Sequence, residues 1–229
     1  MKAVHQHLEQ VLARIRDAER RYTRPAGSVR LLAVSKRQDP EKLRDAFAAG
    51  QYAFGESYLQ EALGKQDLLH DLAIQWHFIG RIQSNKTRQV AERFAWVHSL
   101  CELKHARRLS RQRPAALPPL KACVQVNLSG EPTKGGLAPE SVAEFLSQCQ
   151  DLPGLEVCGL MVLPAPARGE AEQRRPFRAL RALRDRLASA ELPLATLSMG
   201  MSDDLEAAIA EGATIVRVGT AVFGPRPQI

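Results

Sequence analysis

The chain has 229 residues, of which 45% are hydrophobic and 25% charged, and such a composition excludes a disordered or fibrous protein. No apolar run is long enough to cross a bilayer, and residues 1–21 are too highly charged for a signal peptide, so the cytoplasm is the expected location. The net charge of +7 suggests an anionic partner, but the basic residues are scattered and lack interleaved aromatic residues, so we do not expect nucleic acid to be that partner.

Helical and strand patterns alternate along the first half of the chain. An amphipathic helix is predicted over 2–22, followed by a strand over 31–35. Asp39 and Pro40 have the properties of an N-cap and a first helical residue, and Gly50 ends the helix that they begin. Strands then follow at 52–55, 75–80 and 96–100, with helices to about 70, over 84–94 and over 102–113.

The same alternation continues to the end of the chain. Strands are predicted at 120–128, 155–163, 194–200 and 214–219, with helices over 139–150, 174–190 and 203–212. Eight strands separated by helices predict parallel pairing and closure into a (β/α)8 TIM barrel with an extra N-terminal helix. An open doubly wound sheet would normally use fewer strands. We therefore expect one barrel domain over residues 1–229.

Two further patterns have ordinary structural interpretations. In the helix over 174–190, Arg178, Arg181 and Arg184 lie on one face and leucines on the other, which predicts a solvated amphipathic helix. The cysteines are widely spaced, form no CxxC pair and have no clustered metal ligands near them, so we expect reduced structural thiols and no metal site. They are Cys101, Cys123, Cys149 and Cys158.

A lysine stands at the predicted mouth of the barrel. In LLAVSK, Lys36 comes directly after the first strand, and active sites of these barrels lie at the C-terminal ends of the strands. Burial among apolar walls disfavours the charged form of a lysine, and a neutral amine attacks aldehydes to give a Schiff base. The alternative is a lysine whose stem packs while its ammonium reaches solvent.

Glycine-containing loops follow the last two strands, where such barrels commonly bind phosphate. LSMGMSDD offers Ser198 and Gly200 before a helix start, and VRVGTAVFG offers Gly219 and Thr220. The glycines are also explained as plain turn residues, and two aspartates at the same helix start would repel a phosphate unless they cap the helix from its outer side. A lysine together with a phosphate site indicates a Schiff-base aldolase or a pyridoxal phosphate protein.

Motifs over nearly the whole length after residue 30 narrow this choice. They are LLAVSK, FGES-Y-QE, QWHFIG-IQSNK, Q-N-S-E-TKGG, GLM-PAP, LSMGMSDD-EAAI-EG and VRVGTA-FG, in that order. In these motifs the chain resembles the pyridoxal phosphate homeostasis family, the small single-domain relatives of alanine racemase. The resemblance implies a barrel that binds pyridoxal 5'-phosphate.

The resemblance also implies a role for individual residues. Lys36 would hold the cofactor as a Schiff base, and Arg217 would face the pyridine nitrogen. The positions implied for the phosphate are Ser198, Gly200 or Met201, Gly219 and Thr220. Because a guanidinium never accepts a proton, Arg217 would leave the ring nitrogen unprotonated and weaken the ring as an electron sink.

Three more residues are candidates for the cofactor site. Ser57 replaces the asparagine that the family usually has, so the cofactor is expected to be held somewhat differently. His77 would lie near the ring or be a hydrogen-bonded core histidine, and Asn127 would contact the cofactor or satisfy backbone groups. Lys134 is expected to be a solvated loop lysine.

The resemblance implies a carrier more than a catalyst. Related two-domain racemases need a tyrosine from an added domain, which this chain lacks, so we expect a protein that buffers, carries or delivers pyridoxal phosphate to apoenzymes, affects amino-acid and keto-acid balance, and is a monomer. The alternative is a weak amino-acid racemase in which Lys36 and His77 share proton transfer. A module that binds anions through its basic surface ranks last.

Overall fold

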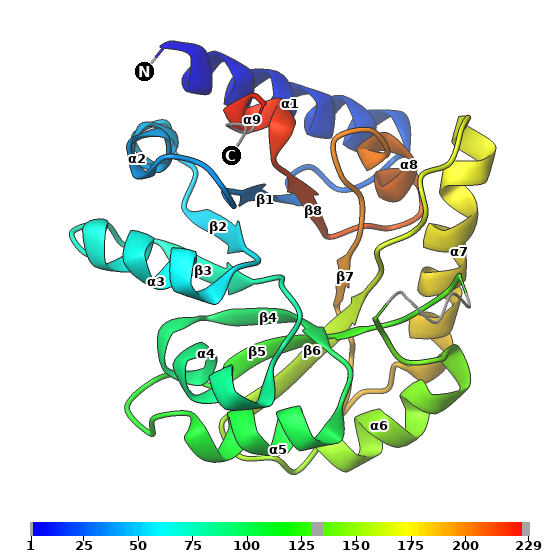
Figure 1. Ribbon diagram of the computed structural model, residues 1–229. Coiled ribbons are helices and arrows are strands. Elements are labelled where there is room, and N and C mark those ends of the chain that lie inside the picture. The colour runs from blue at the N-terminus through cyan, green and yellow to red at the C-terminus, as the bar shows by residue number, and fades with distance from the viewer. Residues whose placement is uncertain (1, 130–134, 226–229) are drawn as a thin grey trace.

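The computed structural model describes residues 2–129 and 135–225, and its centre is a closed barrel of eight parallel strands (Figure 1). The strands pair in sequence order, and β1 returns to pair with β8. This confirms the predicted (β/α)8 barrel. The strands are β1 Arg30–Val34, β2 Ala53–Glu56, β3 Gln75–Phe78, β4 Trp96–Leu100, β5 Leu120–Gln125, β6 Leu155–Met161, β7 Thr196–Ser198 and β8 Ile215–Val218.

Helices surround the barrel on its outside (Figure 1). The α-helices are α1 Lys2–Arg21, α2 Pro40–Ala48, α3 Leu59–Leu68, α4 Thr87–Arg93, α5 Leu103–Gln112, α6 Val142–Cys149, α7 Glu170–Leu187, α8 Leu205–Ala210 and α9 Thr220–Phe223. Short 3₁₀ turns at Ser84–Lys86 and Pro139–Ser141 precede α4 and α6. The added helix α1 packs against α2, α8 and α9, so the first and last helices of the chain lie side by side.

The apolar residues divide into two layers because strand side chains alternate between the two faces of the barrel wall. A large cluster fills the space between the strands and the helices and includes Leu43, Phe54 and Phe177. A small cluster of Trp96, Cys123 and Met161 packs together separately. Buried polar side chains, described below, occupy much of the remaining barrel interior, so the barrel is filled and is not a pore.

Local signals in the sequence explain where several elements begin and end. The Asp39 carboxylate accepts a hydrogen bond from the Glu41 N–H at 2.9 Å, and Pro40 is the first residue of α2, as predicted. Gly50 follows that helix with φ +94°, a conformation that glycine adopts without a steric penalty.

Several predicted boundaries differ from the structure, and one helix was not predicted. For example, α7 begins at residue 170 and not at 174, and β3 ends at residue 78 and not at 80. Strand β7 begins at Thr196 and not at residue 194, because Leu194 has φ +44° and is not extended. Strand β5 ends at Gln125 because the chain then makes a single bridge, from Val126 to Leu137. Residues 220–223 form the short helix α9, which the periodicity did not predict because a single turn is too short to show a repeat.

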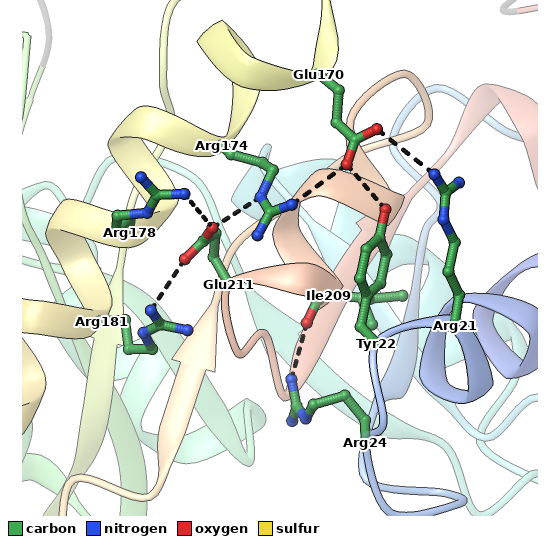
Figure 2. Close-up of polar contacts among 9 residues, drawn as sticks. All are labelled: Arg21, Tyr22, Arg24, Glu170, Arg174, Arg178, Arg181, Ile209 and Glu211. Carbon is green, nitrogen blue, oxygen red and sulfur yellow. Dashed lines mark hydrogen bonds and ion pairs between the residues drawn. The ribbon is translucent and has the colours of Figure 1, made fainter.

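The arginine face of α7 is engaged with the protein, which corrects the expectation of a simply solvated face (Figure 2). Arg174, Arg178 and Arg181 all pair with Glu211, a buried residue at the end of α8, at 2.8, 3.1 and 3.2 Å. Burial alone would raise the pKa of Glu211, but the hydrogen bonds from Arg178 and Arg174 hold it below its usual value. The three arginines stay partly exposed, Arg178 at 63%, but their guanidinium groups reach Glu211 because a buried carboxylate needs a partner.

The other expectations concern the cysteines, membrane-spanning segments and Lys134. All four cysteines are free thiols, and Cys123 and Cys149 are buried. Among the residues that the structure describes, no helix is long and apolar enough to span a membrane. Lys134 lies outside the described residues.

Candidate functional site

A cavity of about 530 Å³ opens at the C-terminal ends of the barrel strands. Lys36, Ser57, Met201, Arg217, Gly219 and Thr220, all predicted as site residues, line it. The apolar part of the wall consists of Val34, Ile79, Met161, Leu163 and Ala221. A second cavity, of about 400 Å³, includes Arg30, Trp96 and Lys121 at the opposite end of the barrel. The predicted residues therefore converge on the mouth, although they come from four separate parts of the sequence.

Lys36 lies in a turn directly after β1. The turn closes with a hydrogen bond from the Gln38 N–H to the Ser35 carbonyl at 3.1 Å, and Arg37 takes a left-handed conformation with φ +58°. A non-glycine residue in this region is uncommon and implies that its surroundings hold it there. The turn ends the strand where the barrel opens and places Lys36 in the wall of the cavity.

Arg217 projects from β8, and its guanidinium is almost entirely buried. Its Nη1 donates to the Ser198 hydroxyl at 2.8 Å and its Nη2 donates to the Val162 carbonyl at 2.8 Å. Burial lowers the pKa of Arg217 to about 10, so the side chain keeps its positive charge at neutral pH. The Ser198 hydroxyl and the Val162 carbonyl are both neutral acceptors, and together they hold the guanidinium in one orientation at the cavity wall.

A chain of hydrogen bonds runs from Arg217 through the barrel. Ser198 Oγ lies 2.8 Å from His98 Nδ1, His98 Nε2 lies 2.9 Å from His77 Nδ1, and His77 Nε2 lies 3.1 Å from Gln75 Oε1. Burial lowers the pKa of His77 to about 3 and that of His98 well below its usual value, so both rings are neutral.

The order of donors in this chain follows from its two ends. Gln75 Oε1 only accepts, so His77 donates from Nε2, and its Nδ1 then accepts from His98. The Nδ1 of His98 is left as an acceptor, so the Ser198 hydroxyl donates to it while accepting from Arg217. Every bond therefore points from the barrel mouth toward the N-terminal end of β3.

The loop after β7 is shaped by one glycine and one aspartate. Gly200 has φ +93°, and a Cβ added there would lie 2.6 Å from the Cβ of Ala208 on α8. The Asp204 carboxylate accepts the Met201 N–H at 2.6 Å, and burial raises the pKa of Asp204. Asp204 thus braces the loop from within, whereas Asp203 lines the cavity. The Met201 N–H, a predicted phosphate donor, is bound to this carboxylate.

The loop after β8 brings the backbone close to the first strand. A Cβ on Gly219 would lie 3.1 Å from the Val34 carbonyl oxygen, a tight contact that glycine avoids. Gly219 is the N-cap of the short helix α9, and Thr220 is its first residue. Both residues line the cavity next to Lys36 and Arg217.

Four predicted residues do not line the cavity. Ser198 and His77 are buried in the barrel interior as links of the hydrogen-bonded chain, so the core-histidine alternative describes the position of His77. Gly200 forms the turn after β7, and its carbonyl accepts a hydrogen bond from the backbone N–H of Arg217. The Asn127 side-chain oxygen accepts from the Ser129 N–H and hydroxyl just after β5.

Sequence reasoning missed two features of the mouth. Arg14 reaches the cavity from α1, where it donates to Glu206 at 2.8 Å and to the Ser202 carbonyl at 3.0 Å. Lys65 of α3 is buried against Glu56 at the end of β2. The signal for Lys65 is its spacing in α3, four residues after Glu61 on the same helix face. No comparable signal existed for Arg14, because its partners are distant in sequence.

No metal centre is evident in the described ranges: no group of three or more His, Cys, Asp or Glu side chains there is placed to hold an ion. The cavity is instead lined by one acidic side chain, Asp203, and by the cationic Lys36, Arg14 and Arg217. Arg14 is paired with Glu206, but Lys36 and Arg217 still outnumber Asp203 in the lining, so the cavity favours an anionic ligand.

The sequence matches known proteins over its full length. Residues 6–227 match the family described as alanine racemase, N-terminal domain. A pyridoxal phosphate homeostasis protein of Pseudomonas aeruginosa is 54% identical over 226 residues, which cover 99% of this chain and 97% of that protein. The protein of the same name from Escherichia coli K12 is 43% identical over 232 residues, with coverage of 99% and 98%.

Solved structures of the same family also resemble this chain. PipY of Synechococcus elongatus, with pyridoxal phosphate bound, superposes with a TM-score of 0.83 at 36% identity and covers 96% of this chain and 100% of its own. Alanine racemase of Corynebacterium glutamicum shares the fold at a TM-score of 0.70 and 18% identity, and this chain covers 62% of it. The chain therefore belongs to the alanine racemase N-terminal domain family, among the pyridoxal phosphate homeostasis proteins.

Proposed function

We propose that the chain binds pyridoxal phosphate in the mouth cavity and serves in the homeostasis of this cofactor. The observation that carries the proposal is the placement of Lys36 and Arg217 in one cavity of about 530 Å³, in a chain 36% identical to PipY, whose structure holds pyridoxal phosphate. The names of the relatives from Pseudomonas aeruginosa and Escherichia coli support the homeostatic role.

The lining of the cavity fits the chemical groups of this ligand. Val34, Ile79, Met161 and Leu163 offer apolar surface to an aromatic ring, and the lining has an excess of positive charge for a phosphate. The Thr220 hydroxyl and the backbone N–H groups of the loop after β8 are donors of the kind that phosphate accepts. When bound, pyridoxal phosphate supplies an aldehyde that condenses with a primary amine, and Lys36 is the lysine in the lining.

Arg217 limits the chemistry of the site. Its pKa of about 10 keeps it protonated, and the Ser198 hydroxyl and Val162 carbonyl fix its guanidinium in place. Facing the ring nitrogen, as the family resemblance implies, it would donate a hydrogen bond without giving up a full proton. Electron withdrawal by the ring is then weak, which suits holding the ligand more than breaking bonds in a substrate.

The position of His77 supports a carrier over a racemase. A racemase would need a second proton carrier beside Lys36, and His77 was the candidate. His77 lies beneath the cavity, and both of its ring nitrogens have hydrogen-bond partners. In this proposal the monomeric chain works in the cytoplasm, as its four free thiols suit a reducing compartment, and hands the cofactor to apoenzymes.

The test is to add pyridoxal phosphate to the purified protein and record the absorbance spectrum, beside the Lys36→Ala variant. We expect a new band in the wild type that borohydride fixes onto the peptide containing Lys36, and no such band in Lys36→Ala. A band of equal size in the variant, with both proteins folded by circular dichroism, would show that the lysine is misassigned.

A second measurement separates carrier from racemase. Amino acids incubated with the loaded protein in heavy water are followed by NMR for exchange of the α-proton. We expect no exchange above that of free pyridoxal phosphate. Exchange that is faster with wild type than with Lys36→Ala would favour the racemase.

A further inference from the structure

A buried cluster of charges lies behind the turn that carries Lys36. Lys65 projects inward from α3, and its side chain is 5% exposed. Its Nζ lies 2.8 Å from Glu56 Oε1, 2.6 Å from Glu61 Oε1 and 2.6 Å from the Ser35 carbonyl oxygen. Glu56, at the end of β2, is fully buried and also accepts the Ser35 hydroxyl at 2.6 Å. We call Glu56, Glu61 and Lys65 the Lys65 cluster.

Both peptide groups that flank Lys36 are hydrogen-bonded to this cluster. The carbonyl before Lys36 belongs to Ser35 and accepts from Lys65 Nζ. The N–H after Lys36 belongs to Arg37 and donates to Glu61, whose carboxylate is itself held by Lys65. The backbone on either side of Lys36 is therefore tied to the same ammonium, once directly and once through a carboxylate.

The turn needs such a restraint. Arg37 has φ +58°, a conformation that costs free energy for any residue other than glycine and persists only where the surroundings impose it. The bond from the Arg37 N–H to Glu61 acts on this residue directly. Without it, the turn would be free to relax to more populated conformations that move the Lys36 side chain.

Stability alone is a poor explanation for the cluster. Desolvating Lys65 and Glu56 costs more than placing apolar side chains of the same size there, so a buried ion pair seldom increases stability over such a replacement. Glu56 Oε2 is buried, and in the described part of the chain it has no hydrogen-bond partner, which adds to that cost. What charged groups provide and apolar ones do not is directional hydrogen bonding to peptide groups.

We propose that the Lys65 cluster is a positioning device that holds the 35–38 turn, so that Lys36 enters the cavity ready to capture the aldehyde. The inference rests on the proposed function, because it concerns how the same lysine acts. Lys65, Glu56 and Glu61 are positioning residues: none of them lines the cavity, and they act through the backbone of the turn.

The first test removes the outer link only. In Glu61→Ala the buried pair of Lys65 and Glu56 stays intact, so the protein is expected to fold. Stopped-flow absorbance with pyridoxal phosphate should show association about 10- to 100-fold slower than wild type, because the reacting amine is no longer held in place. The matched control is Asp71→Ala, which removes a half-exposed carboxylate that pairs with Arg44 at 2.6 Å just after α3, and it should associate at the wild-type rate.

The second test removes the whole buried pair. Lys65→Met alone would leave the buried Glu56 carboxyl without its partner, so it is combined with Glu56→Gln, which removes one acidic and one basic group together. We expect slow association again, with a melting temperature near that of wild type. This combination of rate and stability distinguishes positioning from a purely structural role, which would lower the melting temperature and leave the rate unchanged.

The outcomes are distinguishable from failure of the proposed function. If wild type captures the ligand and both variants associate within twofold of it, the positioning role is wrong and the binding site stands. If wild type shows no captured ligand at Lys36, the proposed function fails and the positioning role falls with it.

Discussion

At the scale of single residues, the barrel interior is unusual because polar side chains fill much of it. Ser198, His98 and His77 are buried and hydrogen-bonded to one another, and they support Arg217 from below. This row of hydrogen bonds is stable only while both histidines remain neutral, since a proton on either ring would turn an acceptor into a donor. A proton on His98 would also add a charge near Arg217.

This requirement predicts acid sensitivity. The folded-state pKa of His77 is about 3 and that of His98 is also lowered, whereas an unfolded histidine titrates near 6.5. The unfolded state therefore takes up protons first, so the stability is full above pH 6.5 and is lost as the pH falls toward 3. Between pH 7.5 and 5.0, the free energy of unfolding should fall by about 2 kcal/mol through His77, and His98 should add a change of the same sign.

Urea denaturation at these two pH values checks the prediction. His105, whose pKa burial also lowers, adds a change of the same sign, so the comparison is made against a His77→Gln variant. The variant should lose about 2 kcal/mol of the pH dependence. A pH dependence identical in the variant and wild type would contradict the assignment to His77.

At the scale of elements, the loop between β7 and α8 depends on one glycine. Gly200 has φ +93° and would place a Cβ 2.6 Å from Ala208, while its carbonyl accepts the Arg217 N–H. Gly200→Ala should therefore lower the free energy of unfolding by at least about 2 kcal/mol, from backbone strain and overpacking together. Ligand affinity should fall as well, because Met201 and Asp203 on the same loop line the cavity.

Gly64→Ala is the matched control for this prediction. Gly64 lies inside α3, and a Cβ there meets no other heavy atom within 4 Å. The substitution should raise stability by about 0.5–1 kcal/mol, because alanine favours the helix. Thermal unfolding of both variants is the measurement. Equal changes in melting temperature for the two variants would show that Gly200 is an ordinary turn residue.

At the scale of the whole molecule, the first and last parts of the chain meet at the mouth. Helix α1 packs on α8 and α9 (Figure 1). Its Arg14 binds Glu206 and the Ser202 carbonyl beside the cavity. Ligand contacts from β1, β2, β7 and β8 would thus join segments from both ends of the sequence. A ligand that contacts these segments binds only the folded barrel, so it should raise the free energy of unfolding of the whole domain.

Melting experiments should show this stabilisation directly. Pyridoxal phosphate at 100 times its dissociation constant should add about 2.7 kcal/mol to the free energy of unfolding. For a domain of this size that corresponds to a rise in melting temperature of about 5–10 °C. Lys36→Ala at the same ligand concentration should show a clearly smaller rise, and an equal rise would place the stabilising site elsewhere.

The barrel, the Asp39–Pro40 helix start and six residues of the cavity wall were all predicted from the amino-acid sequence. The barrel and the helix start follow from local rules, since strand and helix periods repeat along the chain and parallel strands present their C-terminal ends together. Among the wall residues, Ser57, Met201 and Arg217 were expected from the family resemblance. Folding was needed to reveal the positions of Ser198 and His77 below the cavity, the arginines around Glu211 and the Lys65 cluster. Each of these joins side chains from different elements, and a buried polar group takes whichever partner the packing brings within reach.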